Sequence, residues 1–122
     1  MQKISLRSVK NVYKNRSEII KNLRLCALTI IKEKPSVLKV ILFGSIARGD
    51  YGLYSDADVL IIVNKSEYKR YFDRIPEFID FFLNSKVPVD IFPYTAEEIE
   101  RMKSNGNFFI IKALKEGIEL AG

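Results

Sequence analysis

The sequence predicts an α/β (α+β) fold, in which one small mixed β-sheet has helices packed on it. Three observations lead to this prediction. Two apolar, β-branched runs, 37–43 and 57–63, have the composition of buried strands. A third apolar run follows at 87–94, and helical patterns stand before, between and after these runs. At 122 residues the chain has the length of one domain, and 48% hydrophobic residues are enough to build a core.

The first predicted element is a helix over 15–34. Asn15 and Glu18 have the spacing of a capping box, and apolar residues then recur at helical spacing until Pro35 ends the pattern. Cys26 falls on the apolar side of this helix, which predicts a core position for its thiol.

The middle of the chain is predicted to alternate strands with a loop and a helix. Between the strands at 37–43 and 57–63, the Gly-, Ser- and Asp-rich stretch 44–55 predicts a loop with one short helix. Residues 67–85 then have a helical pattern that Pro76 should break or kink.

The last third is predicted to contain two helices and a short strand. Thr95 and Glu98 have the spacing of a second capping box, which opens a helix that extends to about Ser104. The remaining elements are the turn Asn105-Gly106, a last helix from Asn107 to Gly117, and an edge strand at 118–120.

The charge is unevenly distributed along the chain. Ten of the 20 Lys and Arg residues lie in the first 39 positions, together with only two of the 15 acidic residues. We therefore divide the chain into a basic N-terminal extension with the first helix, 1–35, and a core over 36–122, within a single domain. The basic segment is either a solvated surface or a patch that meets RNA, an acidic partner or nucleotide phosphates.

Composition also excludes several kinds of chemistry. With no His and one Cys, an intrachain disulfide is impossible, a zinc site of the usual kind is nearly excluded, and Ser-His-Asp catalysis is absent. Catalysis would have to use carboxylates, hydroxyls, Lys or Arg, together with a hard cation. No signal peptide or membrane-spanning run is apparent, so we expect a cytoplasmic protein without membrane contact.

Two aspartates at the start of the second strand are the first candidate site residues. Because a strand alternates faces with period two, Asp56 and Asp58 should project to the same side and converge on one cation. Paired carboxylates suit Mg²⁺. Upstream, Gly44 permits close backbone approach, and Ser45 can offer a hydroxyl and an N–H to phosphate oxygens.

Two further charged residues complete the candidate set. Asp90 lies among apolar residues of the third strand, which is unfavourable without a partner. It would be a third carboxylate of a site for two Mg²⁺ ions, or else part of a salt bridge. Arg48 is either a phosphate ligand or a surface ion pair. Tyr51 and Tyr54 are expected to pack, or else to stack on a nucleobase or the acceptor.

These residues resemble a known family. The string Phe-Gly-Ser-x-Ala-Arg-Gly-Asp-x5-Asp-x-Asp, residues 43–58, is similar to the signature of the DNA polymerase β-type nucleotidyltransferase superfamily and, most closely, of its minimal nucleotidyltransferases. The resemblance covers roughly residues 36–120. It implies a nucleotidyltransferase fold and often a HEPN-domain partner; in several such pairs the minimal enzyme is an antitoxin that transfers AMP from ATP to a Tyr of a HEPN ribonuclease toxin.

Carried over by position, the resemblance gives each candidate residue a role. Asp56, Asp58 and Asp90 would hold the metal ions, and Asp90 would also help to deprotonate the attacking hydroxyl. Gly44 and Ser45 would bind phosphates, with assistance from Arg48. Because almost every residue after 36 is used by the core, the acceptor must bring its own docking surface, as a folded protein would, or else a second chain must complete the pocket.

Three functions follow from the sequence. The first is Mg²⁺-dependent transfer of a nucleotide, AMP from ATP, to a hydroxyl of a partner protein, expected to be a HEPN ribonuclease. The second is an antitoxin that acts by occlusion with weak catalysis. The third is an RNA-directed nucleotidyltransferase, or an RNA-binding protein, that uses the basic N-terminal segment.

Overall fold

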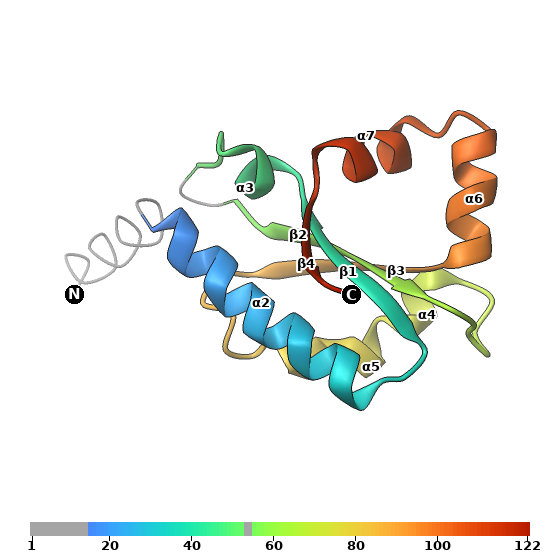
Figure 1. Ribbon diagram of the computed structural model, residues 1–122, viewed down its shortest axis with the longest axis horizontal. Helices are drawn as coiled ribbons and strands as arrows, with labels where there is room; N and C mark the ends of the chain where they lie inside the picture. Colours follow the sequence, from blue (N-terminus) through green and yellow to red (C-terminus); the bar gives the residue numbers. More distant parts are fainter. Residues whose placement is uncertain (1–14, 53–54) are drawn as a thin grey trace.

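The computed structural model describes residues 15–52 and 55–122. Its elements follow the predicted order of one long helix, two strands, short helices, a third strand, two helices and a last strand (Figure 1). The elements are α2 (Arg16–Glu33), β1 (Val37–Phe43), α3 (Ser45–Arg48), β2 (Ala57–Val63), α4 (Tyr71–Arg74), α5 (Pro76–Ile79), the 3₁₀ turn η1 (Asp80–Phe82), β3 (Val89–Thr95), α6 (Ala96–Ser104), α7 (Phe108–Glu116) and β4 (Ile118–Ala121).

The four strands form one mixed sheet in the order β3-β2-β1-β4. β1 is antiparallel to both β2 and β4, whereas β2 and β3 are parallel. The mixed sheet and the strand at 118–120 are therefore confirmed, and β4 lies at an edge as predicted.

Among the described residues, no helix combines the length and hydropathy needed to cross a bilayer.

Helices cover both faces of the sheet, and neighbouring strand residues alternate between the two layers. Val40 and Leu42 of β1 pack into the larger core cluster, where α2, α5 and η1 cover the sheet. Ile41 and Phe43 point the other way, into a smaller cluster with α6 and α7. Figure 1 shows α2 crossing one side of the sheet and the α6–α7 pair standing on the other.

Helix α2 belongs to the larger core, although it lies within the segment predicted as a basic extension. Its buried residues are Ile19, Leu23, Cys26, Ala27 and Ile30. The core position of Cys26 is thus confirmed, and burial raises the pKa of its thiol. The capping box predicted at the start of this helix is wrong: Asn15 is the N-cap residue, but its side chain accepts no hydrogen bond there. Its φ of −106° and ψ of 57° lie outside the extended conformation that suits a capping side chain.

The single helix predicted over 67–85 is wrong in its first four and last three residues, and correct in its break. Pro76 separates α4 from α5. Residues 67–70 are not helical because the carbonyl oxygens of Tyr68 and Lys69 turn toward the guanidinium of Arg74. The third strand begins at Val89 rather than Val87.

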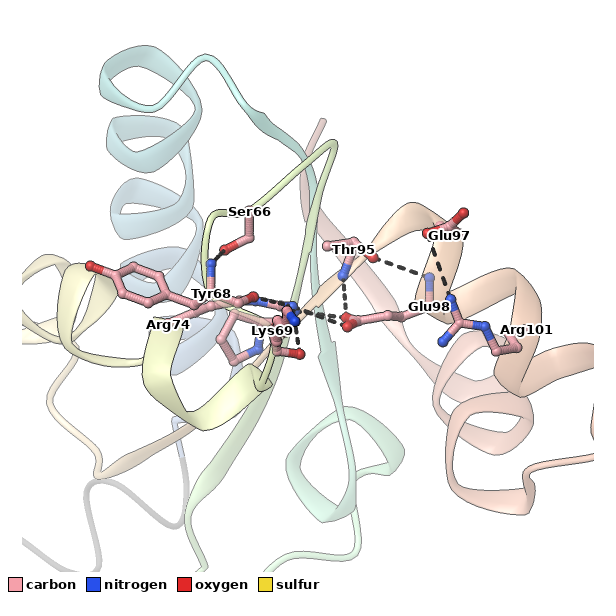
Figure 2. Close-up of polar contacts among 9 residues, drawn as sticks. Ser66, Tyr68, Lys69, Arg74, Thr95, Glu97, Glu98 and Arg101 are labelled. Carbon is pink, nitrogen blue, oxygen red and sulfur yellow. Dashed lines mark hydrogen bonds and ion pairs between the residues drawn. The ribbon is translucent and has the colours of Figure 1, made fainter.

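Arg74 of α4 and Glu98 of α6 form an ion pair that joins these two helices, and we call it the clamp (Figure 2). Arg74, with 3% of its surface exposed, donates to both carboxylate oxygens of Glu98 at 2.7 and 3.0 Å and to the carbonyl of Pro93 at 3.0 Å. Glu98 also accepts from the backbone N–H of Thr95, whose hydroxyl accepts from the N–H of Glu98. The predicted capping box at Thr95 and Glu98 is therefore confirmed, and the clamp joins it to Arg74, the last residue of α4.

Candidate active site

The three aspartates predicted from the sequence lie at one end of neighbouring strands. Asp56 directly precedes β2, Asp58 is its second residue, and Asp90 is the second residue of β3. Asp58 and Asp90 are register partners in the parallel β2–β3 pair. Since neighbours such as Val59 and Ile91 belong to the larger core, alternation places the aspartates on the face that α6 and α7 cover.

The carboxyl groups at this end of the sheet influence one another's charge. Burial, followed by the negative charges of Asp90 and Asp56, raises the pKa of Asp58 to about 6, and the positive charge of Arg48 only partly opposes this. The pKa of Asp90 is also raised, first by burial and then by the charge of Asp56 and a hydrogen bond with it. Among the described residues, no Lys or Arg forms an ion pair with Asp90, so the salt-bridge alternative lacks support.

This donor set fits a hard divalent cation in its chemistry. Burial and the charges of neighbouring carboxylates raise the proton affinity of Asp58 and Asp90, and a bound cation would relieve this situation. Within 15–52 and 55–122, however, no three acidic side chains already form a cluster of metal ligands. Ion binding would therefore require the carboxylates to turn toward a shared centre, and their role as ligands stays a prediction.

Gly44 brings the backbone against the second of these carboxylates. It follows β1 directly and has a φ of +82°, a conformation that side chains rarely adopt. A Cβ built on Gly44 would lie 2.4 Å from Oδ2 of Asp58. Ser45 begins α3 immediately afterwards, so the Gly-Ser step and the carboxylates face each other across the β1–β2 pair.

Arg48 forms ion pairs in this structure. Its Nε lies 3.2 Å from Oδ2 of Asp50, and its Nη1 lies 3.5 Å from Oε1 of Glu116. The hydrogen bond to Asp50 is the main cause of the raised pKa of Arg48. The surface ion-pair interpretation thus describes the arrangement seen, while a phosphate contact stays a prediction.

Sequence reasoning missed two features around the Gly-Ser step. The first is Arg16, in the first turn of α2, which donates to the carbonyl oxygens of Ile46 and Ala47 in α3. The second is a cavity of about 290 Å³ beside Gly44. Its lining residues are Phe43, Gly44, Arg48, Phe108, Phe109, Lys112, Ala113 and Glu116. No local pattern links positions 16 or 108–116 to the motif, because only the packing of α2 and α7 brings them there.

Of the remaining residues that the sequence singled out, one lies in the core and the others lie outside the described residues. Tyr51 is buried in the larger core cluster, as the packing interpretation expects. Tyr54 and the basic segment 1–14, which carries the RNA hypothesis, lie outside the described residues.

Comparison with known proteins identifies the family. A family model described as a nucleotidyltransferase domain matches residues 27–120, which is more than half of the chain. The chain belongs to this family. The motif resemblance and the nucleotidyltransferase fold are thereby confirmed, and the matched region contains all six predicted site residues.

Two relatives are informative about this nucleotidyltransferase. A Methanocaldococcus jannaschii protein named putative protein adenylyltransferase is 54% identical over 48 residues, which are 39% of this chain and 46% of that protein. The match thus covers less than half of the relative's length. A crystal structure of a putative nucleotidyltransferase from Sulfolobus solfataricus superposes with a TM-score of 0.62 at 22% identity, covering 92% of this chain and 85% of that one. It has the same fold.

A third similarity is weaker. A crystal structure of a toxin–antitoxin with AMP-PNP superposes with a TM-score of 0.47 at 18% identity, covering 88% of this chain and 73% of the other.

Proposed function

We propose that this nucleotidyltransferase transfers a nucleoside monophosphate, AMP from ATP, to a hydroxyl group of a partner protein, with two Mg²⁺ ions held by Asp56, Asp58 and Asp90. The observation that supports it best is the meeting of these carboxyl groups with the Gly44 turn at one end of the sheet. Carboxylates placed beside a phosphate-binding turn are what metal-assisted nucleotidyl transfer requires.

The chemistry is an in-line displacement at phosphorus. The acceptor oxygen forms a bond to the α-phosphorus while the bond to the bridging α,β-oxygen breaks, and pyrophosphate leaves. The carboxylate of Asp90 is the proposed acceptor for the proton of the acceptor hydroxyl. Bound at the three carboxylates, Mg²⁺ would supply neutralisation of the triphosphate charge and a more acidic acceptor hydroxyl.

The cavity beside Gly44 suits the nucleoside part of the donor. Phe109 packs against Phe43 and Phe92 at ring-centroid distances of 5.4 and 5.3 Å, so it presents a fixed aromatic wall. A base can stack on such a wall, while Lys112 and Arg48 line the same cavity and can contact phosphates. Gly44 also lines the cavity, and its closeness to Asp58 would place the triphosphate toward the carboxylates.

A protein acceptor is supported by the relative's name and by an exposed apolar surface near the cavity. The Methanocaldococcus jannaschii relative is named as a protein adenylyltransferase. Phe108, which lines the cavity, is 74% exposed, and Ile111 of the same helix is 42% exposed. Apolar side chains of this kind are often covered by a protein partner. A HEPN ribonuclease toxin, silenced by the transfer, is the partner that the motif resemblance favours.

A labelling experiment tests the proposal. The purified protein, its Asp56→Asn/Asp58→Asn variant and an Asp80→Asn control are incubated with Mg²⁺, ATP labelled at the α-phosphate and a lysate of the source cells. We expect label in one protein band with the native protein and the control, and none with the double variant. Mass spectrometry of that band would identify the acceptor.

Other outcomes would contradict parts of the proposal. Label in RNA rather than protein would favour the RNA-directed enzyme. No label with any of the four nucleotides, from folded protein, would favour the antitoxin that acts by occlusion. Transfer retained in the double variant would exclude the assigned role of the carboxylates.

A further inference from the structure

The carbonyl groups of the Gly44–Asp50 loop are satisfied from two sources. Within the loop, the carbonyl of Gly44 accepts from the N–H of Arg48 at 3.0 Å, and that of Ser45 accepts from the N–H groups of Gly49 and Asp50 at 2.8 and 3.1 Å. The next two carbonyls are those of Ile46 and Ala47, and α3 is too short to supply partners for them.

Arg16 provides the missing donors. Its Nε lies 2.7 Å from the carbonyl oxygen of Ile46, and its Nη2 lies 2.5 Å from that of Ala47. Two N–H groups of one planar guanidinium thus bind two successive carbonyls at the end of α3, a geometry that the fixed fork of Arg suits and a single ammonium does not. Both carbonyls belong to buried residues, so they have little access to replacement water.

The position of Arg16 is itself fixed. It is the first residue of the 18-residue helix α2, whose apolar side is anchored in the larger core. The family model begins at residue 27, so Arg16 stands outside the region that the family model covers. The contact therefore ties the first turn of α2, which precedes the matched region, to the Gly-Ser loop.

We infer that Arg16 is a positioning residue that holds the Gly44–Asp50 loop in the conformation that receives the nucleotide. Its effect on the loop follows from the contacts alone, and its effect on the nucleotide rests on the proposed function. Arg16 touches neither the carboxylates nor the proposed nucleotide cavity in this structure, so it acts through the loop backbone.

The test compares Arg16→Met and Arg16→Lys with Arg24→Ala, which removes an exposed cation from the same helix. Amide hydrogen exchange of the metal-free protein is measured first. We expect the N–H groups of Arg48, Gly49 and Asp50 to exchange about tenfold faster or more in Arg16→Met, with strands β1 and β2 unchanged. Arg16→Lys should fall between, and Arg24→Ala should match the native protein.

Nucleotide measurements follow on the same proteins. We expect Arg16→Met to raise the dissociation constant for MgATP, and the KM for transfer, about tenfold with a smaller change in kcat, since a mobile loop is a binding defect rather than a loss of reacting groups. Partial recovery in Arg16→Lys would separate this role from a general loss of stability.

The two inferences fail in different ways. Unchanged exchange at residues 48–50 in Arg16→Met, or exchange raised equally throughout the molecule, would overturn the positioning role. A native protein that neither binds MgATP nor transfers a nucleotide would overturn the proposed function, while hydrogen exchange would still decide whether Arg16 holds the loop.

Discussion

Gly44 and Asp58 lie so close that a methyl group on Gly44 would stand 2.4 Å from a carboxylate oxygen of Asp58. We therefore predict that Gly44→Ala lowers transfer activity about 100-fold, because it displaces both the backbone turn and a carboxylate proposed to hold the metal ions. Gly106→Ala is the matched control, since Gly106 also has a positive φ, of 72°, but no atom lies within 4 Å of its added Cβ. Both variants should lose about 1 kcal/mol from backbone strain, as measured by chemical denaturation. Equal activity of the two variants would contradict the prediction.

The raised pKa of Asp58 predicts a pH-dependent stability of the metal-free protein. Its folded pKa of about 6 lies above the unfolded value, so the folded state binds the extra proton. The contribution of Asp58 to stability is therefore most favourable below about pH 4 and is lost as pH rises through 6. The shift corresponds to at most about 3 kcal/mol, which we discount to about 1 kcal/mol because the side chain is half-buried.

Asp58→Asn should accordingly raise the Tm of the metal-free protein at pH 7.5 and flatten its pH dependence between 4 and 6. Thermal unfolding across this pH range, with Asp80→Asn as an exposed control, measures the effect. A lower Tm for Asp58→Asn at pH 7.5 would show that the carboxylate is not under electrostatic stress.

Mg²⁺ should make the native protein more stable than Asp58→Asn, the reverse of the order expected without metal. If the three carboxylates hold the ion, adding it at ten times its dissociation constant stabilises the native protein by about 1.4 kcal/mol. Asp58→Asn should gain much less, because it has lost a charged ligand. Titration calorimetry and Tm measurements with Mg²⁺ check this, and equal gains for both proteins would exclude Asp58 as a ligand.

Phe109 is predicted to contribute to affinity for the base of the nucleotide. Phe109→Ala should weaken ATP binding about tenfold or more, because base–aromatic stacking is worth about 1–3 kcal/mol. Binding of inorganic triphosphate, which has no base, should change little. The ratio of the two affinities is the measurement, with Phe72→Ala, on α4, as a control that also removes a half-exposed ring. A ratio that does not change would place the base elsewhere.

The clamp between Arg74 and Glu98 is predicted to be a major contributor to stability. Glu98→Gln should cost about 3 kcal/mol, because it removes the charge that compensates a buried guanidinium. The Arg74 guanidinium lowers the pKa of Glu98, so this stabilisation is complete at neutral pH and is lost as pH falls through the lowered pKa. Glu97→Gln changes the neighbouring residue, whose exposed pair with Arg101 at 3.6 Å should matter by less than about 0.5 kcal/mol. Urea denaturation of both variants tests the contrast.

Much of the fold could be predicted because its signals are local. The β-branched runs, the capping box at Thr95 and Glu98, and Asn107, whose side chain accepts from the N–H of Ile110, each depend on residues a few positions apart. The failures involve distant partners. Residues 67–70 have a helical pattern, but the buried Arg74 takes up the carbonyls of Tyr68 and Lys69.

The candidate site was predictable only in part for the same reason. That Asp56 and Asp58 share a face follows from strand alternation alone. Asp58 stands beside Asp90 because of the register of two parallel strands that are joined by a long connection. The only sequence signal for this pairing was an isolated carboxylate in an apolar strand. Arg16 and the cavity wall at Phe109 gave no hint, because helix ends reach the motif only once the whole chain has packed.

The parallel pairing of β2 and β3 also separates two tasks in space. The carboxylates stand at the Asp58–Asp90 rung, whereas the Arg74 clamp holds the strands near the Val63–Thr95 rung, five residues further along. Five strand residues span about 16 Å. Substitutions at sites more than about 10 Å apart usually have additive effects, so a change at the clamp need not affect the carboxylates. Substitutions at the clamp can therefore raise or lower the stability of the protein without changing its reaction chemistry. Selection can thus adjust stability and catalysis almost independently on one small sheet.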